Sequence, residues 1–492
     1  METFIQSLIA AGGEVYEVGG CVRDELLGRQ VKDCDLIVRR LPLERLRQLL
    51  RPYGQVSVVG KSFGVLKFYP KGGEREYDIA LPRKESSTGV GHRDFTVDFD
   101  PELPLVADLG RRDFTINAMA FSLSSGELVD PFGGRADLER RVLRQVFREA
   151  FAEDPLRLMR AVQFCARFDL TPDAETLEAM RAHALLIETV SPERIIEEVR
   201  KLFLADHPSI GFRLMRETGL LSIVFPTIHG MIGVQQPRKD EDVFDHTMKV
   251  LDASRNTPEM DYAGDLDVMF AALFHDAGKP RTKGFDEEKE QVTFYGHQIV
   301  STHIARKWMK KYRIETIGVD PKSVLNLVEH HMFETKSFFS DKAMRRFIRK
   351  VGPDQIVRLL DLRIADKKGG RFPTKLREIV KLKERIVAEL QKKTPLGPKD
   401  LAITGHDLMD LGVPPGPRMG EIIHVLVDLV VDHPEHNTRE YLMAWVKSHC
   451  LDNQPIVYVS DDPDDSDDMA TEMLQVLCPD EKEGDADERD RS

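Results

Sequence analysis

Two aspartates, Asp33 and Asp35, stand directly before the apolar run at residues 36–38, which predicts a β-strand. Residues i and i+2 of a strand point to the same face, so the two carboxylates are expected to converge. Paired carboxylate oxygens suit Mg²⁺, which also binds phosphate oxygens and water. Two ions held in this way activate an attacking hydroxyl and stabilise a leaving pyrophosphate. An Asp-x-Asp pair alone more often marks a solvated turn, so the neighbouring residues decide between these interpretations.

The residues before this strand favour a phosphate-binding site. Gly19 and Gly20 allow the backbone to approach a triphosphate closely, because they have no side chain. Arg23 offers a planar guanidinium fork to phosphate oxygens. The combination predicts a nucleotide-binding turn ahead of a metal-binding strand.

The order of these motifs resembles that of a known family. Gly-Gly-x-Val-Arg-Asp-x-Leu-Leu-Gly at residues 19–28, followed by Asp33-x-Asp35, resembles the signature of class II tRNA nucleotidyltransferases and bacterial poly(A) polymerases. Further segments that resemble motifs of this family lie, in the family's order, at residues 111–120, 130–134, 153–157 and 191–194. The resemblance covers roughly residues 15–230.

This resemblance implies a template-independent enzyme that adds C and/or A residues, up to a complete CCA end, to an RNA 3′ end, in particular that of tRNA. The 3′ hydroxyl attacks the α-phosphate of CTP or ATP, and pyrophosphate leaves. The implied catalytic residues are Asp33 and Asp35, with Mg²⁺ as the cofactor. The residues implied in nucleotide binding are Gly20, Arg23, Arg112, Asp154, Arg157 and Arg160.

Two of these residues have the chemistry to read a base. Asp154 and Pro155 are typical of a helix start, as N-cap and first helical residue, and Arg157 and Arg160 share a helix face. A carboxylate accepts an amino hydrogen of cytosine or adenine, and a guanidinium donates to the adjacent ring nitrogen. Uracil and guanine present a keto oxygen and a ring N–H there instead. By the resemblance, Asp154 and Arg157 take the place of a nucleic-acid template.

Two features leave the nucleotide choice open. Relatives in the family often have an arginine one helical turn after Arg160, where this chain has Gln163. If that arginine holds phosphate, the affinity or the nucleotide choice differs here. Residues 83–110 are rich in Gly, Asp, Ser and Pro and are predicted to form one long loop. The equivalent loop of the family helps to switch from C to A addition, but the residues here do not indicate which setting it supports.

A second group of residues, in the C-terminal half, resembles the metal site of the HD phosphohydrolase superfamily. His275 and Asp276 follow an apolar helical run at 268–273, His246 lies upstream and Asp366 downstream. The resemblance covers about residues 240–370, and it implies that these four side chains are metal ligands.

Imidazole and carboxylate ligands together favour Mn²⁺, Fe²⁺, Ni²⁺ or Zn²⁺, a divalent transition metal rather than Mg²⁺. Such an ion lowers the pKa of its bound water and supplies hydroxide for phosphoester hydrolysis. His297 and His330 are further candidates for a second metal or a phosphate contact. The competing interpretation is a vestigial HD fold whose histidines are hydrogen-bonded in the core.

The net charge of −13 is concentrated at the C-terminal end. Residues 451–492 hold 15 acidic and 3 basic side chains, a net of −12, so the remainder carries −1. A nearly neutral body binds a polyanion through local basic patches, and the charge does not exclude RNA. No apolar run approaches the roughly 18 residues that a membrane span needs, so no membrane partner is expected. Five cysteines without paired spacing favour a reducing cytoplasm.

We expect an α+β fold in which a mixed-sheet nucleotidyltransferase head precedes all-α domains. The expected domains are the head at 1–150, a helical neck that binds nucleotide and RNA at 151–235, an HD domain at 236–375, a helical C-terminal body at 376–450 and an acidic disordered tail at 451–492. The sequence does not indicate an oligomeric state.

Several other functions are compatible with these motifs. A poly(A) polymerase has nearly the same head motifs, and so do enzymes that add only C residues or only the final A. A different reaction class is an HD phosphohydrolase whose head merely binds RNA. Intact Asp33, Asp35, Asp154 and Arg157 argue against an inactive head. A non-catalytic RNA-binding module does not need carboxylates paired on a strand.

Overall fold

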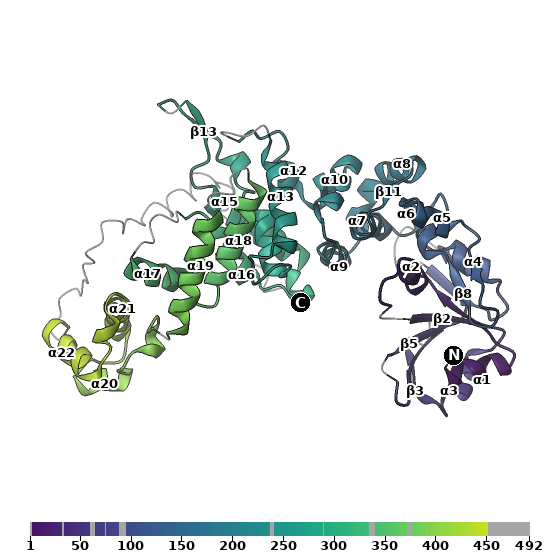
Figure 1. Ribbon diagram of the computed structural model, residues 1–492, viewed down its shortest axis with the longest axis horizontal. Helices are drawn as coiled ribbons and strands as arrows, with labels where there is room; N and C mark the ends of the chain where they lie inside the picture. Colours follow the sequence, from purple (N-terminus) through teal and green to yellow (C-terminus); the bar gives the residue numbers. More distant parts are fainter. Residues whose placement is uncertain are drawn as a thin grey trace, which may run out of the picture. The chain divides into compact units, whose positions relative to one another are not determined.

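The structure, a computed structural model of the chain, divides into two compact units, Met1–Pro226 and Thr227–Ser492. It describes residues 2–31, 34–59, 64–73, 75–87, 95–236, 241–288, 290–333, 340–370, 376–392 and 394–450. The first unit combines a mixed sheet with helices and the second is mostly helical, which confirms the α+β fold class (Figure 1). Asp33 and the acidic tail lie outside the described residues, so the predictions about them stay predictions.

The first unit begins with the sheet and continues with helices. Its strands are β1 (Glu14–Val18), β2 (Cys34–Arg39), β3 (Gly54–Val59), β4 (Val65–Pro70), β5 (Tyr77–Ala80), β6 (Arg83–Ser87), β7 (Phe95–Phe99), β8 (Ala120–Ser122), β9 (Leu128–Val129), β10 (Val142–Leu143) and β11 (Thr171–Pro172). Its helices are α1 (Thr3–Ala10), α2 (Gly20–Leu26), α3 (Leu43–Leu50), α4 (Leu105–Gly110), α5 (Gly134–Glu139), α6 (Ala150–Glu153), α7 (Leu156–Phe168), α8 (Ala174–His183), α9 (Pro192–Leu202), α10 (Ser209–Thr218) and α11 (Leu220–Val224), with 3₁₀ turns at Thr115–Asn117 and Ala184–Thr189.

The sheet has seven strands in the order β3-β4-β5-β2-β1-β8-β9, in which β2 and β5 run parallel and the other neighbours antiparallel. Strand β2 is therefore an interior strand. Leu36 packs in the core shared with α1 and α3, while Ile37 packs on the opposite face with Leu105 of α4. Side chains alternate between the faces of a strand, so Asp35 lies on the face of Ile37.

Helix α7 joins the sheet to the helices that follow. It packs against α9 and α10, and most of its side chains are buried. Arg157 and Arg160 extend from α7 to the segment 111–113, where they bind Arg111 and Asp113. The helix therefore fixes the second motif of the sheet region against the helical part of the same unit.

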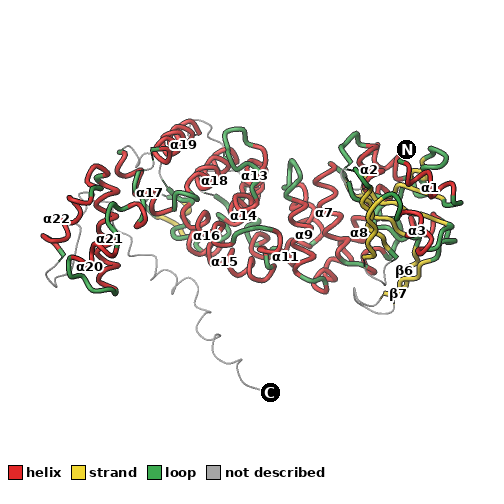
Figure 2. The backbone as a smooth tube through the Cα atoms, turned by 90° about the horizontal axis from the view of Figure 1, so that it is seen from below, coloured by secondary structure: helices red, strands yellow, loops and turns green. Residues whose placement is uncertain are grey.

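Two local predictions were wrong. Residues 83–110 are not one loop, because β6 and β7 pair as an antiparallel ribbon, visible in Figure 2, and α4 follows. Backbone pairing tolerates polar residues, so composition alone did not reveal the ribbon. Asp154 is not the N-cap of α7, since Pro155 occupies that position. The carboxylate of Asp154 still accepts a hydrogen bond from the Leu156 amide, at 3.4 Å.

The second unit is a series of helices with one short hairpin. Its helices are α12 (Pro226–His229), α13 (Val243–Asn256), α14 (Leu266–Phe274), α15 (His297–Tyr312), α16 (Pro321–His330), α17 (Asp341–Val351), α18 (Ile356–Gly369), α19 (Leu376–Gln391), α20 (Gly405–Asp410), α21 (Pro417–Asp432) and α22 (Arg439–His449). Strands β12 (Gly284–Asp286) and β13 (Gln291–Thr293) form the hairpin, and 3₁₀ turns lie at Lys279–Arg281, Ile314–Ile317, Pro398–Asp400 and Pro434–His436.

Helix α14 is the buried centre of this unit. A helix that is apolar on all sides must be covered on all sides, and α13, α15, α16 and α18 all pack against α14. Phe270 and Phe274 lie against Trp308 of α15, with ring centroids 6.0 and 5.3 Å apart. The C-terminal end of α14 therefore places His275 and Asp276 inside the bundle.

The last helices form a separate small core. Ile422 and Leu426 of α21 pack with Leu442 and Val446 of α22. Asp432 at the end of α21 forms an ion pair with Arg346 of α17 at 2.6 Å. No helix in the described ranges is long and apolar enough to cross a membrane.

Candidate functional site

A cavity of about 680 Å³ in the first unit is lined by residues of β2, α6, α7, the turn after β1 and the segment 111–117. The residues that line it are Gly19, Gly20, Arg23, Asp35, Arg83, Arg111, Arg112, Asp113, Asn117, Glu153, Asp154, Leu156, Arg157, Arg160, Phe164 and Arg194. The structure thus brings together Asp35 and all six residues predicted for nucleotide binding. Arginines outnumber carboxylates in this lining, so the cavity suits a polyanion such as a triphosphate.

Asp35 projects from β2 and has a carboxylate opposite it on the next strand. In the parallel pairing of β2 with β5, Asp35 is directly opposite Asp78. Residues paired in this way point to the same face of the sheet, so two carboxylates lie side by side. Sequence reasoning gave Asp78 no role, because nothing in the residues near it shows which strand pairs with β2.

The turn after β1 is built around an arginine. Gly19 has a φ of +76°, a conformation that side chains rarely adopt, and a Cβ on it would lie 2.5 Å from Nη1 of Arg112. The guanidinium of Arg112 therefore occupies the space that a side chain at 19 would fill. Arg112 also contacts the buried Asp108, with Nη2 3.4 Å from Oδ2. Gly20, the first residue of α2, lines the cavity beside this turn.

A chain of hydrogen bonds crosses the floor of the cavity. Arg23 donates from Nη1 to Asn117 Oδ1 at 2.7 Å, and Asn117 donates from Nδ2 to Asp113 Oδ1 at 3.0 Å. Arg160 donates from Nε to Asp113 Oδ2 at 2.8 Å. The rings of Phe164 and Phe168 lie below Arg23, with centroids 5.3 and 4.3 Å from its Cζ. The network fixes two guanidinium groups at the cavity before any ligand binds.

Asp113 holds this network as a carboxylate. Burial alone would raise its pKa, but Arg160 and the hydrogen bond from Asn117 outweigh burial and keep the pKa below its usual value. The same contact with Asp113 raises the pKa of Arg160. Asp113 belongs to a motif quoted from the sequence, yet it had no predicted role, because its contact with Arg160 spans 47 residues.

Asp154 and Arg157 are each held by other groups. Arg157 donates to the carbonyl oxygens of Ala150 and Arg111, at 3.3 and 2.9 Å. The carboxylate of Asp154 accepts from Nη2 of Arg194 at 3.3 Å. Arg194 belongs to the motif at residues 191–194. This motif therefore holds the aspartate of the motif at residues 153–157.

Gln163, the departure from the family pattern, is buried on α7. Its Oε1 accepts a hydrogen bond from Arg167 Nη1 at 3.1 Å. Burial and the nearby Arg23 lower the pKa of Arg167. Gln163 therefore positions a neighbouring arginine at this end of α7.

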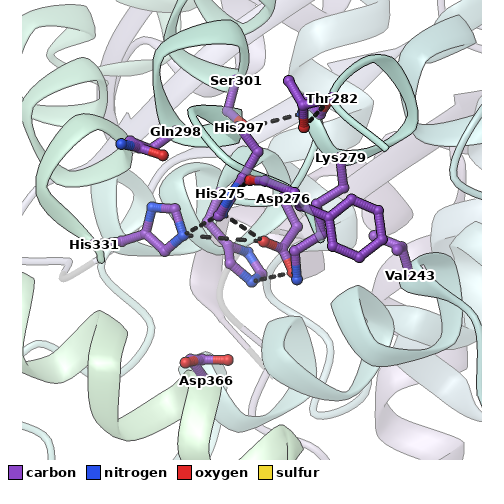
Figure 3. A network of polar contacts seen from close by, with 12 residues as sticks. Val243, His275, Asp276, Lys279, Thr282, His297, Gln298, Ser301, His331 and Asp366 are labelled. Carbon is purple, nitrogen blue, oxygen red and sulfur yellow. Dashed lines mark hydrogen bonds and ion pairs between the residues drawn. The ribbon is translucent and has the colours of Figure 1, made fainter. Parts of the chain in front are cut away.

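The second unit contains a cluster of histidines and aspartates, each from a different part of the bundle (Figure 3). His246 lies on α13, His275 and Asp276 directly follow α14, and Asp366 lies on α18. His297 begins α15, and His331 follows α16. The possible ligand atoms of this cluster form two sets, and the atoms within each set lie within 4.8 Å of one another. The first set is His246, His275 and Asp366, and the second is Asp276, His297 and His331. The structure thus brings together all four ligands predicted for the HD site.

The hydrogen bonds of three histidines fix their tautomers. Nδ1 of His275, His297 and His331 lies 2.8, 2.7 and 2.7 Å from the backbone carbonyl oxygens of Ala272, Phe294 and Val328. Each Nδ1 therefore carries a proton, so Nε2 of each ring offers a lone pair whenever that ring is neutral. This arrangement is typical of metal-bound histidines.

The lone pairs then face one another. Nε2 of His297 lies 3.2 Å from Nε2 of His331, and neither nitrogen can donate while both rings are neutral. Nε2 of His275 is buried and lies 3.2 Å from Oδ2 of Asp276 without a well-aligned hydrogen bond. A cation between these nitrogens relieves the repulsion, so the donor set fits a divalent transition metal.

Asp276 joins both halves of the cluster. Its Oδ1 lies 3.3 Å from Nε2 of His297, its Oδ2 lies 3.2 Å from Nε2 of His275, and Lys279 binds Oδ2 at 2.6 Å. Burial alone would raise the pKa of Asp276, but His275 and Lys279 hold it well below the usual range. The pKa of Asp366 is also well below its usual value, because His246 and Arg363 outweigh its burial. Both carboxylates are thus ready to bind a cation.

His331, and not His330, belongs to the cluster. His330 ends α16, and its Nδ1 binds back to the carbonyl oxygen of Asn326 at 3.0 Å. Burial lowers the pKa of His331 well below its usual value. The sequence shows two adjacent histidines at a helix end, and only the packing decides which of them faces the bundle.

The fold, the cavity of the first unit and the histidine–aspartate cluster of the second define a class of protein. It is a nucleotidyltransferase head joined to an HD-type metal-binding bundle. Profiles of four families match the chain. They are "Poly A polymerase head domain" at residues 15–144, "Probable RNA and SrmB-binding site of polymerase A" at 169–231, "HD domain" at 243–368 and a tRNA nucleotidyltransferase domain 2 at 323–446.

Curated relatives agree with these matches. A "Multifunctional CCA protein" of Nitrosococcus oceani is 42% identical over 290 residues, which span 58% of this chain and 66% of the relative. A protein of the same name from Actinobacillus pleuropneumoniae is 36% identical over 327 residues, 65% of this chain and 75% of the relative. The chain belongs to the family of tRNA nucleotidyltransferases and poly(A) polymerases, and it is a nucleotidyltransferase that carries an HD domain.

Solved structures show the same fold. A CCA-adding enzyme of Bacillus stearothermophilus, solved with CTP, superposes with a TM-score of 0.65 at 24% identity and covers 90% of this chain and 95% of its own. A Thermotoga maritima CCA-adding enzyme, solved with tRNA, gives a TM-score of 0.54 at 22% identity over 90% of this chain and 93% of its own.

Proposed function

We propose that this protein completes the CCA end of tRNA, using CTP and then ATP and releasing pyrophosphate. The observation that carries the proposal is one cavity that holds Asp35, a set of arginines, and the pair Asp154 and Arg157. The curated relatives named Multifunctional CCA protein support the choice of product.

The geometry of Asp154 and Arg157 supports base reading. Both side chains are anchored by groups outside the pair, namely Arg194 and two backbone carbonyls, and these contacts fix their separation at the start of α7. A cytosine or adenine places its amino group at the carboxylate and its ring nitrogen at the guanidinium. Uracil and guanine leave both groups mismatched, which costs about 1–3 kcal/mol for each unsatisfied buried group.

The reacting groups are positioned at the sheet. Asp33 and Asp35 would hold Mg²⁺, and Asp78 lies beside Asp35 on the same face of the sheet. Bound by these carboxylates, Mg²⁺ would supply the charge that favours deprotonation of the RNA 3′ hydroxyl and compensates the pyrophosphate. Arg23, Arg112 and Arg160 bind the triphosphate, and the network through Asn117 and Asp113 keeps two of them in place. The protein therefore acts mainly by positioning and by charge neutralisation.

The test is an extension assay with Mg²⁺ and three versions of one tRNA. The versions end before the tail, after the first C and after the second C, and each is incubated with CTP, ATP or both. Growth that stops after C, C and A supports the proposal. Growth limited to the C steps, or to the final A, shows a partial enzyme, and a long A ladder shows a poly(A) polymerase. No extension contradicts the proposal.

A second activity is favoured by the HD cluster. We infer that it binds Mn²⁺, Ni²⁺ or another divalent transition metal and hydrolyses phosphoesters. The supporting observation is the set of histidine Nε2 atoms that lie close to Asp276. The test measures hydrolysis of phosphomonoesters and phosphodiesters with each metal, for the wild type and Asp276→Ala. Equal hydrolysis by both proteins refutes the assignment.

A further inference from the structure

Helix α15 (His297–Tyr312) of the second unit has a charge pattern that neither site described above uses (Figure 1). It contains four lysine and arginine side chains and no aspartate or glutamate. The four, called the basic face of α15 below, are Arg306, Lys307, Lys310 and Lys311, and all of them are exposed. His297 of the HD cluster is at the other end of the helix, about two and a half turns before Arg306.

The four cations share one side of the helix. At about 100° per residue, positions 306, 307, 310 and 311 fall within an arc of about 140°. The opposite side holds Trp308, Met309 and Tyr312, which are buried. Trp308 packs on Phe270 and Phe274 of α14, so the helix is anchored in the core of the unit. The basic face therefore stands on a rigid support.

The basic face has no acidic partner among the described residues. None of its four side chains forms a hydrogen bond or an ion pair with another residue there, and Lys311 lies only over the ring of Tyr312, with Nζ 5.1 Å from the centroid. Other exposed cations of the unit are compensated, as Lys368 is by Glu259 at 2.8 Å. The helix dipole favours cations in the last turn, where two of the four lie, but it does not explain the two that precede them.

The surroundings of the basic face indicate the kind of partner. No large apolar side chain is exposed among residues 297–313, whereas protein interfaces bury apolar and aromatic side chains at their centre. The apolar side of α15 is buried within the unit, so it cannot enter a membrane surface. Exposed cations without an apolar centre are typical of contacts with the phosphates of a nucleic-acid backbone.

We propose that the basic face of α15 binds the phosphate backbone of the RNA whose 3′ end the first unit extends. The inference rests on the proposed function only for the identity of this RNA, which is tRNA. The cavity that holds Asp35 has about 680 Å³, enough for a nucleotide and the RNA 3′ end but not for the rest of the RNA. Phosphate contacts on α15 add affinity without reading sequence. The second unit thus has an RNA-binding role besides its metal chemistry.

The first experiment measures binding of tRNA to the full chain at several salt concentrations. Lys307→Gln combined with Lys310→Gln is expected to weaken binding about 3–10-fold near 0.1 M salt, because two phosphate contacts are lost. The slope of log K against log salt is expected to fall in magnitude by about 2. Both lysines are exposed, so the melting temperature should not change.

The matched control is Arg45→Gln combined with Arg51→Gln, which removes two exposed arginines of the first unit. It is expected to leave the affinity for tRNA and the salt slope at their wild-type values. If the lysine double variant also keeps the wild-type affinity and slope, the proposal is overturned. The same holds if the control variant loses as much affinity as the lysine double variant, because the effect then belongs to net charge and not to α15.

The extension assay separates this inference from the proposed function. In the lysine double variant, the KM for tRNA is expected to rise about 3–10-fold, in line with weaker binding, and the KM for CTP is expected to stay unchanged. Equal rises in both constants contradict a contact with the RNA backbone. If the wild type extends no tRNA while the double variant still weakens tRNA binding, the proposed function fails and the basic face remains an RNA-binding surface.

Residues 451–492 are the other candidate occupant, because they hold 15 acidic and 3 basic side chains, a net charge of −12. If they bind the basic face in place of RNA, the lysine double variant keeps its affinity for tRNA and its hydrodynamic radius increases. Size-exclusion chromatography with light scattering measures the radius. This result assigns the basic face to a segment of the chain itself and overturns the proposal.

Discussion

The cavity of the first unit and the metal cluster of the second are built from different side chains for different charges. Among the described residues, the cavity is lined by seven arginines and four acidic side chains, fixed by contacts such as that of Arg160 with Asp113. The cluster is a buried set of histidines around Asp276 and Asp366. The cavity therefore attracts an anion, and the cluster attracts a cation.

The difference explains how each site holds its geometry without a ligand. In the cavity, arginines that repel one another are separated by Asp113, Asp108 and backbone carbonyls. In the cluster, His275, His297 and His331 are each aligned through Nδ1 by a backbone carbonyl. One site depends on long-range ion pairs and the other on local hydrogen bonds. Substitutions should therefore affect the two sites independently, which the following predictions test.

The largest effect is expected for Asp35→Ala. We expect nucleotide incorporation to fall at least about 1,000-fold, because the metal and the pyrophosphate lose their charge compensation. Transition-metal binding at the HD cluster is expected to stay unchanged. Glu44→Ala, an exposed acidic residue on α3, is the control and keeps full activity. The extension assay measures the first effect and metal analysis the second; wild-type incorporation by Asp35→Ala refutes its role.

The next effect contrasts two adjacent histidines. His331→Ala is expected to weaken Mn²⁺ or Ni²⁺ binding by about 10–100-fold, as the loss of a residue at or next to a metal does. His330→Ala is the matched control, because its ring binds Asn326 at the end of α16. Titration calorimetry and circular dichroism measure affinity and folding. An equal loss of metal affinity in both variants contradicts a specific role of His331 in the cluster.

Arg157→Ala is expected to change the choice of nucleotide. The preference for CTP over UTP should fall by about 10–100-fold, since the guanidinium no longer distinguishes a ring nitrogen from a ring N–H. Arg160→Ala, in the same cavity, should weaken all four nucleotides alike, because Arg160 binds Asp113 and faces phosphate. Competition between nucleotides in single-step extension measures both. An unchanged preference in Arg157→Ala contradicts base reading by this residue.

The smallest effect concerns stability and pH. Asp113→Asn is expected to lower the free energy of unfolding of the first unit by about 2–3 kcal/mol near neutral pH, because Arg160 loses its buried partner. The pKa of Asp113 is depressed in the folded state, so its stabilisation is present above the unfolded pKa of about 4. The stabilisation is lost as the pH falls through the lower folded pKa. Denaturant unfolding between pH 7 and pH 3 should show the difference shrink, and a difference that stays constant argues against the ion pair.

The sequence predicted more of the first site than of its surroundings. The strand at β2, the turn at Gly19 and the shared face of Arg157 and Arg160 follow from local rules of spacing, and the structure places these residues at one cavity. The ribbon of β6 and β7 was missed, because backbone pairing between two polar segments leaves no hydrophobic pattern.

The residues that the sequence missed are defined by contacts between distant segments. Asp78 lies beside Asp35 only through the parallel pairing of β5 with β2. Asp113 gains its role from an arginine 47 residues away.

The sequence by itself determined which chemical groups this chain possesses and in which order, and that order identified the family. The spacing of the motifs sufficed because each is a short segment whose local geometry follows from residue type. Only the tertiary structure decided which of these groups meet. Strand register placed Asp78 beside Asp35, and the packing of four helices around α14 chose His331 over His330. Register and packing are fixed by burial of the whole core, so no local segment contains them.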